Sequence, residues 1–396
     1  MTEKQSSPFY PRKVVPEDLF VGRMAEREIL VRYACEVLSG KQQNVFLLGD
    51  RGIGKSSLAS FVRYYLSIEK NILGLHVSLG RVKTLAQMVH HIFEAVLKET
   101  RGQSLFEVIR PLFGKHIRKV EALGISVTFA PPEEDLNKLV QAFPEALSNL
   151  LKKIERQKRG LFLVLEDING LLHSNEFANW YKSFADEVAT HYRWYPVCVV
   201  LIGVPQIWDR LYEHQASLMR IFRLVQIDRL SDGEVKEFFE KALSKVEMKV
   251  MPEALRLLVR YSSGLPLLMQ EIGEATYWED KDGVIDELDA SAGIKVAAES
   301  VGKKYLDPVV YRAIRSERYR GILDKLAEML APREFQKKDV EKNLDNEEKR
   351  VFHNFLRKMQ ELKVIEQAVE KERGTYRFVN EIYPLYIILE ARRRKK

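Results

Sequence analysis

The sequence predicts an α/β protein in its first part, followed by an all-helical region and a small C-terminal domain with two strands. Short apolar runs, typical of buried strands, alternate with helical patterns up to about residue 228, which indicates a parallel sheet. Only helical periodicity follows between residue 231 and about residue 315. A length of 396 residues is enough for two or three such domains.

The elements of the α/β part can be placed in order. Apolar runs predict strands at 44–48, 74–79, 161–165 and 197–202, and apolar stripes predict helices at 25–38, 55–66, 84–98, 136–154 and 175–190. Residues 101–132 fit neither pattern, and we interpret them as an irregular insertion. Three prolines near the N-terminus predict an extended leader. The expected domains are a leader (1–18), a core (19–228), a helical domain (229–315) and a C-terminal domain with a basic tail (316–396).

The C-terminal domain is expected to hold three helices and then two strands. Helical patterns cover 321–330, 336–342 and 347–362, and strand patterns cover 364–369 and 375–379. From Arg315 onward the chain has 21 Lys and Arg residues against 15 Asp and Glu residues. Such an excess of positive charge is typical of proteins that bind polyanions, and equally of a solvated tail, so the charge alone leaves both interpretations open.

The composition excludes several classes of protein. With 46% hydrophobic and 30% charged residues, the chain is typical of globular proteins and not of disordered or fibrous ones. Its longest apolar run, 197–204, has eight residues, whereas a membrane-spanning helix needs about 20. No apolar stretch follows the charges of the N-terminus, so a secretory signal is not expected. Cys35 and Cys198 lie in apolar segments without metal-ligand spacing, which favours a reduced, cytoplasmic protein without zinc.

The strongest motif is a glycine-rich loop with the sequence Gly49-Asp50-Arg51-Gly52-Ile53-Gly54-Lys55-Ser56, followed by Ser57. It fits GxxxxGK[ST] and lies directly after a predicted strand and before a predicted helix. Glycines let the backbone curl so that successive N–H groups point at one anion, and the helix adds its positive end. Lys55 is expected to reach the β- and γ-phosphates, and the Ser56 hydroxyl to bind Mg²⁺. The loop therefore predicts a site for a nucleoside triphosphate with Mg²⁺.

A pair of acids ends the strand predicted at 161–165. Glu166 is expected to bind Mg²⁺, and Asp167 to orient or deprotonate the attacking water, because ligands bind at the carboxyl ends of parallel strands. Hydrolytic proteins of this class usually have Asp first and Glu second. The reversed order gives a longer metal ligand and a shorter base, which predicts slow hydrolysis. The alternative is a strand that ends in two solvated acids.

Together these motifs resemble AAA+ ATPases of the STAND and archaeal origin-recognition group. The segment Phe20-Val21-Gly22-Arg23 is similar to the group's hhGR element, which by this resemblance packs on adenine. Gly264-Leu265-Pro266 is similar to the GxP element of the lid, whose Pro266 would close over the base. The resemblance covers about 250 residues and implies a P-loop NTPase core, an all-α lid and a C-terminal winged helix, with ATP and Mg²⁺ as cofactors.

At one position the sequence departs from the family pattern, and at another it does not identify the family's residue. The strand predicted at 197–202 ends in Gly203-Val204-Pro205, without the Asn or Thr that commonly senses the γ-phosphate, and Gln206 is the substitute nearby. Arg220 and Arg223 lie between this strand and the lid, where arginine fingers often occur. Arg220 is the catalytic candidate, and a surface arginine that covers the junction is the alternative.

The helix predicted at 347–362 has an apolar face and a polar face. The polar face is made of Arg350, His353, Asn354, Arg357 and Lys358. These side chains can bond phosphates or base edges in a major groove, so we expect contact with double-stranded DNA. Lys371 and Arg373 at the tip of the predicted wing can add contacts, whereas the glutamates at 366, 370 and 372 would repel DNA. An interaction or oligomerisation module is the alternative.

These predictions combine into two functional hypotheses. The first is a cytoplasmic, ATP- and Mg²⁺-dependent switch, a slow ATPase that couples its nucleotide state to DNA binding or to assembly on DNA. The second is a nucleotide-binding signalling or defence scaffold that forms a homo-oligomer or binds a partner protein through its C-terminal domain. Neither hypothesis involves a membrane.

Overall fold

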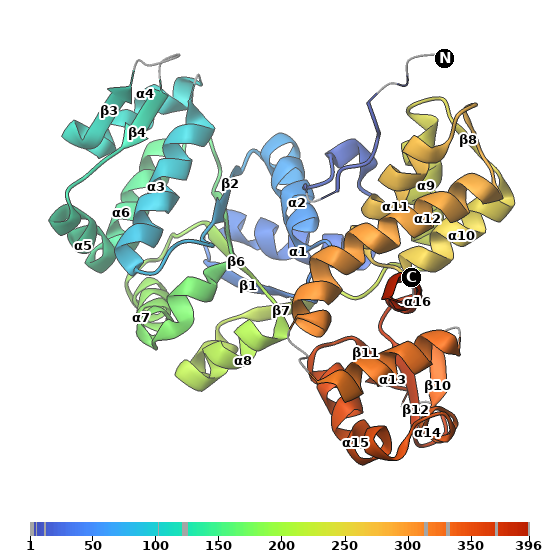
Figure 1. The fold of residues 1–396 in the computed structure, drawn as a ribbon. Helices are drawn as coiled ribbons and strands as arrows, with labels where there is room; N and C mark the ends of the chain where they lie inside the picture. The colour runs from blue at the N-terminus through green and yellow to red at the C-terminus, as the bar shows by residue number, and fades with distance from the viewer. Residues whose placement is uncertain are drawn as a thin grey trace. The chain divides into compact units, whose positions relative to one another are not determined.

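The computed structural model describes residues 4, 6–11, 13–101, 103–120, 126–312, 316–329, 333–368 and 371–394. The chain divides into two compact units, residues 14–228 and residues 1–13 together with 229–396. The chain therefore crosses between the units twice, at residues 13–14 and 228–229. Each unit has its own architecture (Figure 1).

A five-stranded parallel sheet forms the centre of unit 14–228. Its strands follow the spatial order β2 (Leu73–Ser78), β5 (Leu161–Glu166), β6 (Val197–Gly203), β1 (Gln43–Leu48) and β7 (Arg223–Gln226). The inner strands β5 and β6 are buried along nearly their whole length, which explains why each is one continuous apolar run. The predicted α/β core with a parallel sheet is confirmed.

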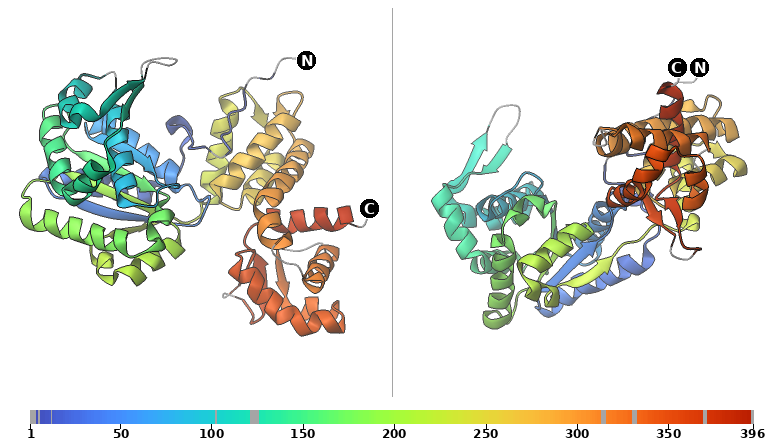
Figure 2. Two further views of the ribbon diagram at one scale, coloured as in Figure 1. Left: turned by 60° about the vertical axis from the view of Figure 1, so that its left-hand side comes forward. Right: turned by 60° about the horizontal axis from the view of Figure 1, so that its bottom comes forward.

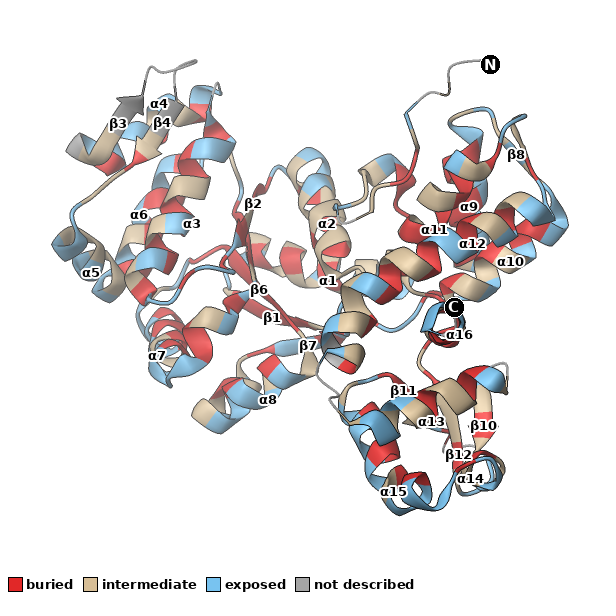
Figure 3. Ribbon diagram, in the orientation of Figure 1, coloured by how far each residue is buried: buried red, intermediate tan, exposed pale blue. Residues whose placement is uncertain are grey.

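Helices cover both faces of this sheet. On one face, α1 (Met24–Glu36) contacts β1, β6 and β7, and α2 (Lys55–Glu69) contacts β2 and β5. Alternate residues of the strands pack on the other face against a second group of helices. That group comprises α3 (Leu85–Thr100), α6 (Phe143–Ile154), α7 (Glu176–His191) and α8 (Pro205–His214). The result is a three-layer arrangement with two buried interfaces, coloured red in Figure 3.

The segment 101–132 is not irregular, so that prediction is wrong. It forms α4 (Ser104–Phe113) and a hairpin of two antiparallel strands, β3 (Ile117–Val120) and β4 (Ser126–Phe129). Figure 2 shows this hairpin next to α4 and apart from the central sheet. The helix forms because its buried residues recur every four positions, and Phe113 packs edge-on against Phe129 of β4 at 5.3 Å.

The single helix predicted at 136–154 is two helices, α5 (Glu133–Gln141) and α6. Pro144 lies in the first turn of α6, where its missing N–H costs nothing, but it cannot continue a preceding helix. The sequence also does not predict β7. Only Val225 of its four residues is buried, so this edge strand has no apolar pattern to reveal it.

The other unit begins with a helical part. Its four helices are α9 (Asp232–Ser244), α10 (Pro252–Ser262), α11 (Pro266–Glu279) and α12 (Glu287–Val301), followed by a π-helix at Gly302–Tyr311. Residues of the N-terminal leader pack on these helices. Phe9 is buried between Phe238 and Phe239, and any side chain at Gly273 would overlap its ring.

The C-terminal part contains more elements than predicted. Its order is α13 (Glu317–Glu328), β10 (Glu334–Gln336), α14 (Lys337–Lys342), α15 (Asn346–Glu361), β11 (Ile365–Gln367), β12 (Thr375–Phe378) and α16 (Ile382–Arg394). The three strands form an antiparallel sheet in the order β10-β12-β11. The sequence does not predict β10, which has three residues, or α16.

The helix α16 uses part of the basic C-terminus for packing. Arg393 forms an ion pair with Glu299 of α12 at 2.6 Å, and Arg394 pairs with Asp324 of α13 at 2.7 Å. In the sequence, the charge of Arg392–Arg394 favours interpretation of this segment as a tail. In the structure, the buried residues before these arginines form one stripe of a helix. These two cations are therefore partly neutralised by the unit's own carboxylates.

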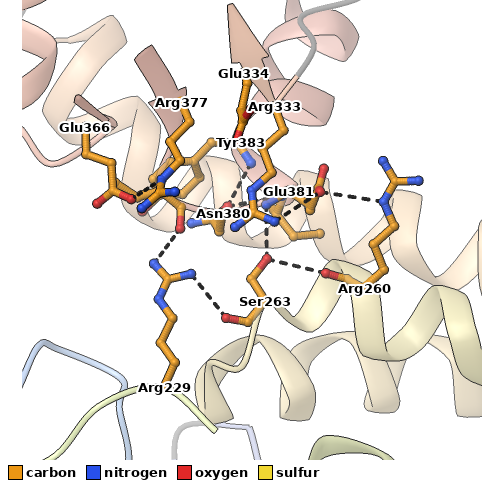
Figure 4. A network of polar contacts seen from close by, with 12 residues as sticks. Arg229, Arg260, Ser263, Arg333, Glu334, Glu366, Arg377, Asn380, Glu381 and Tyr383 are labelled. Carbon is orange, nitrogen blue, oxygen red and sulfur yellow. Dashed lines mark hydrogen bonds and ion pairs between the residues drawn. The ribbon is translucent and has the colours of Figure 1, made fainter. Parts of the chain in front are cut away.

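A polar network joins the helical and C-terminal parts (Figure 4). The Arg229 guanidinium donates to the carbonyl oxygens of Ser263 at 3.1 Å and Val379 at 2.5 Å. The N–H of Glu381 donates to Ser263 Oγ at 3.2 Å, and its carboxylate pairs with Arg260 at 3.5 Å. The turn before α11 is thereby fastened to the start of α16.

Candidate functional site

The glycine-rich loop connects β1 to α2 at the carboxyl end of the sheet. Gly52 and Gly54 have φ values of 79° and 95°, which side-chain-bearing residues rarely adopt. A Cβ at Gly49 would lie 2.9 Å from Ile53 Cγ2 and 3.0 Å from the Ile227 carbonyl oxygen. The loop is thus shaped so that glycine is needed at three positions, and it ends where α2 presents its first N–H groups, which have no partner within the helix.

Lys55, the first residue of α2, folds back over the loop. Its Nζ donates to the carbonyl oxygens of Gly49 and Asp50, both at 2.8 Å. Burial lowers the pKa of Lys55 to about 8, although the carboxylates of Glu166 and Asp50 oppose this shift. The ammonium group is therefore held at the loop, in surroundings that favour a negatively charged ligand.

Side chains from two other elements contact Glu166, the last residue of β5. The Ser56 hydroxyl of α2 donates to Glu166 Oε1, and His76 Nε2 of β2 lies 2.8 Å from Glu166 Oε2. Burial alone would raise the pKa of Glu166, but hydrogen bonds from His76 and Ser56 and the charge of Lys55 hold it below its usual range. Ser56 and Glu166 are therefore in direct contact, so that both oxygen donors lie within reach of one metal ion.

Sequence reasoning missed His76. Its signal was a single imidazole within an otherwise apolar strand, and that pattern alone does not indicate which neighbour the ring will contact. The parallel pairing of β2 with β5 brings it to Glu166.

Asp167 follows directly after β5 and has a different environment. It adopts φ 61°, a left-handed conformation that Asp tolerates better than most residues, and its side chain is exposed beside Gly80. Its carboxylate makes no hydrogen bond or ion pair with the residues that the structure describes. The two acids thus differ in environment, because Glu166 is held by hydrogen bonds and Asp167 faces solvent.

The segment Phe20-Val21-Gly22-Arg23 is buried against the loop and α2. Phe20 stacks on Phe61 with ring centroids 4.7 Å apart. Arg23, with only 6% of its surface exposed, donates to the carbonyl oxygen of Ile53 at 3.0 Å and to that of Asp228. Arg23 therefore fastens the phosphate loop to the last residue of the unit.

The remaining loop residues complete the surface around these contacts. Ser57 Oγ accepts a hydrogen bond from the Val15 N–H at 3.4 Å, while the side chains of Asp50 and Arg51 are exposed. Ile53, by contrast, is buried with 3% exposure. Ile53 thus anchors the loop in the core, while the side chains of Asp50 and Arg51 face solvent.

The structure separates the two candidate arginines. Arg223 donates to Gln43 Oε1 at 3.1 Å, pairs with Glu36 at 3.6 Å and lies over the Tyr33 ring at 4.7 Å. Arg220 is exposed at the end of a short 3₁₀ helix and forms no ion pair or hydrogen bond within the described residues. Arg223 is thus held in place by the core, whereas Arg220 is available to a ligand or partner.

Pro266 begins α11 in the other unit, as the first residue of the helix. The preceding Gly264 has φ 68°, and its Cβ position would lie 2.4 Å from the Leu230 carbonyl oxygen. Glycine at this turn is needed because the chain approaches its own backbone. The placement of Pro266 over a base stays a prediction.

The polar face of α15 is exposed along its whole length, as Figure 3 shows in pale blue. Its members are Arg350, His353, Asn354, Arg357 and Lys358. Two of these cations have partners on the same helix, since Arg350 contacts Glu347 at 2.8 Å and Lys358 contacts Glu361 at 3.1 Å. Arg357 forms no hydrogen bond or ion pair with any described residue.

The hairpin β11–β12 carries cations that are paired within the domain. Lys371 forms an ion pair with Glu334 at 2.6 Å, and Arg377 pairs with Glu366 at 2.6 Å. The position of Glu370 lies outside the described residues. The hairpin therefore offers less unpaired positive charge than its composition indicates.

The residues present fit a magnesium ion bound together with phosphates. Ser56 Oγ and the Glu166 carboxylate are hard oxygen donors, and Mg²⁺ is usually held by one or two protein ligands, phosphates and water. No group of three or more His, Cys, Asp and Glu side chains within the described residues could hold a metal ion alone. In the parts of the chain that the structure describes, no helix combines the length and the apolar character that crossing a membrane requires.

Comparison with known proteins finds similarity to ATPases. Residues 19–182 match the family model described as the AAA ATPase domain. No curated protein matches the sequence. The Walker-type ATPase of Pyrococcus abyssi is a similar solved structure, with 14% identity, a TM-score of 0.55, and coverage of 93% of this chain and 96% of that chain.

The ORC2 protein of Aeropyrum pernix, solved as ADPNP-ADP complexes, is also similar. The identity is 13%, the TM-score 0.60, and the match covers 98% of this chain and 99% of that chain. At these identities the likeness concerns the fold. Residues 19–182 thus match the AAA ATPase domain, and the predicted resemblance to archaeal origin-recognition ATPases of the AAA+ P-loop class is confirmed for the fold.

Proposed function

We propose that this chain is an ATP- and Mg²⁺-dependent switch that hydrolyses ATP slowly and couples its nucleotide state to the binding of double-stranded DNA. One observation carries the nucleotide part of the proposal: Lys55, Ser56 and Glu166 converge on the glycine-rich loop at the carboxyl ends of β1 and β5. Ligands of open parallel sheets bind at this edge.

In the proposed mechanism the side chains of the loop have separate tasks. Lys55 exchanges its contacts with two carbonyl oxygens for the β- and γ-phosphates, where its charge stabilises the transferred group. The first N–H groups of α2 donate to phosphate oxygens. Ser56 and Glu166 hold Mg²⁺, which when bound neutralises negative charge on the phosphates.

Asp167 is the proposed acceptor of the proton from the attacking water. It is exposed and makes no hydrogen bond with described residues, so its carboxylate is available. It is one methylene shorter than the usual glutamate, from which we expect slow turnover, and a bound water can bridge the gap to the attacking water. Arg220 is the proposed arginine finger, acting on nucleotide held by a neighbouring copy in a homo-oligomer.

Phosphate release under single-turnover conditions tests this assignment. Asp167→Asn should slow release by about 100-fold, the usual scale of a lost general base, and leave ATP affinity nearly unchanged. Asp209→Asn removes an exposed carboxylate from α8 in the same unit and serves as the control. Equal release rates in wild type and Asp167→Asn would contradict the role of Asp167.

The DNA part of the proposal concerns α15. Helix, strand, two helices and two strands in this order, with a three-stranded antiparallel sheet, support a winged helix in which α15 is the recognition helix. Its exposed polar face and the unpaired Arg357 support contact with phosphates and base edges.

A second candidate function is a nucleotide-binding scaffold that binds protein through the same domain. The internal pairing of Lys371, Arg377, Arg350 and Lys358 favours it, because paired cations attract DNA less. Salt titration of duplex binding separates the candidates. Affinity that falls steeply with rising salt supports the switch on DNA, and negligible binding at low salt supports the scaffold.

A further inference from the structure

The contact between His76 and Glu166 crosses two neighbouring strands. His76 Nε2 and Glu166 Oε2 are 2.8 Å apart, and each side chain is about one fifth exposed, at 19% and 20%. An ionised carboxylate has only acceptor atoms, so Oε2 accepts the hydrogen bond in this contact. Nε2 must therefore carry the proton and donate it to the carboxylate.

The strand register explains why this histidine reaches the acid. In the parallel ladder His76 lies opposite Val164, and Ser78 lies opposite Glu166. Side chains two residues apart share a face, so His76 and Glu166 are diagonal neighbours on one face of the sheet.

That face is the one covered by α2. A Cβ at Gly74, two residues before His76, would lie 2.3 Å from Cγ of Arg63 on α2. Ser56, His76 and Glu166 consequently lie together between the sheet and the start of α2. Each carboxylate oxygen of Glu166 then has its own donor, with Ser56 on Oε1 and His76 on Oε2.

A glutamate at this position needs such an anchor more than an aspartate does. Its extra methylene adds a rotatable bond, so ordering a glutamate side chain costs more conformational entropy than ordering an aspartate. We propose that His76 is a positioning residue that holds Oε2 of Glu166, so that Oε1 stays directed at Ser56 and the Mg²⁺ position. The inference rests on the proposed nucleotide and Mg²⁺ site, and explains how the reversed Glu-Asp order can still bind metal.

The proposal separates Mg²⁺-dependent from Mg²⁺-independent nucleotide binding. In the presence of EDTA the affinity for a fluorescent ATP analogue depends on the loop and Lys55, and His76→Ala should leave it unchanged. With Mg²⁺ the same variant should lose about 10-fold in affinity, the lower end of the effect of residues that orient metal ligands. His76→Gln, whose amide nitrogen can replace Nε2 as a donor, should recover most of that loss.

Two further variants serve as controls. His214→Ala removes another part-buried histidine of the same unit, which bonds the Leu172 carbonyl oxygen, and should not change the effect of Mg²⁺. Glu166→Asp shortens the acid out of reach of His76, so adding His76→Ala to it should cost little more. Thermal unfolding of each variant checks that the unit is folded.

The outcomes distinguish the inference from the function on which it rests. A wild-type chain that binds no ATP analogue in either condition would overturn both. Binding by the wild type, with the same gain from Mg²⁺ in His76→Ala, would overturn the role of His76 alone. Equal losses with Mg²⁺ and with EDTA would also overturn it, because they would show a structural effect on the loop.

Discussion

The candidate nucleotide site and the polar face of α15 are built in opposite ways. At the first, backbone conformation and cross-element hydrogen bonds hold the central groups, from Gly54 at φ 95° to Glu166 between Ser56 and His76. At the second, long side chains lie exposed on one helix, and some pair with acids one turn away. Buried, mutually held groups are preorganised for a ligand, whereas exposed ion pairs contribute little and exchange readily.

A sequence motif predicts a site reliably where the main chain fixes the positions of the residues. A glycine at a left-handed position and a lysine at the first turn of a helix are fixed by the main chain, so a sequence pattern can specify them. The charge available on α15 depends on which acids pair with which cations. Glu347 and Glu361 each lie three residues from a cation of this face, a spacing that allows pairing, and the structure shows that both pairs form.

The strongest effect on ATP affinity is expected from a substitution in the glycine-rich loop site. Lys55→Ala should weaken ATP binding by more than about 100-fold, because it removes the buried positive charge nearest the phosphates. Calorimetric titration with ATP and Mg²⁺ measures this, and thermal unfolding shows whether the fold is retained. Lys70→Ala, at the other end of α2, is the matched lysine control and should bind like the wild type.

A smaller effect is expected on α15. Replacing Arg357 and Lys358 with glutamine should weaken duplex binding by about 10-fold and reduce the slope of log K against log salt by about 2, one unit for each lost phosphate contact. Lys371→Gln with Arg377→Gln changes the net charge equally, but these cations are paired with Glu334 and Glu366. Equal effects of the two double variants would show that net charge, and not the exposed face of α15, governs binding.

The weakest effect is expected for the dependence of ATP affinity on pH. The pKa of Lys55 is about 8 without ligand, and bound phosphates favour its charged form and raise the pKa. Affinity should therefore be highest below pH 8 and fall as pH rises above 8, and binding at pH 8 should take up about half a proton. Calorimetry in buffers of different ionisation enthalpy measures this uptake. Affinity that rises between pH 7 and 9 would contradict the assignment, and Lys55→Ala should show no uptake.

The sequence predicts the sheet well where strands are buried on both faces. β1, β5 and β6 appear as continuous apolar runs, whereas β7 has one buried residue and β10 three residues in all. Helix ends are harder to predict, and the single helix expected over 136–154 is interrupted at Pro144, which has no N–H with which to continue the preceding helix. The apolar stripe of α16 is not recognised in the sequence because basic residues follow it directly.

For the candidate site, local patterns predict the loop and the acid pair, but not their neighbours. His76 lies 90 residues before Glu166 in the chain and meets it only through strand pairing. Arg23 is predicted to belong to a base-binding element, and the structure shows its guanidinium on the carbonyl oxygens of Ile53 and Asp228. Such contacts depend on tertiary structure, which no spacing rule specifies.

The central claim is that the glycine-rich loop binds a triphosphate together with Mg²⁺. Titration of the wild-type chain with ATP by isothermal calorimetry, with Mg²⁺ and again with EDTA, tests it most directly. We expect saturable binding with one site per chain, tighter with Mg²⁺ than with EDTA. Absence of saturable heat in both conditions, or equal affinity in Lys55→Ala, would contradict it.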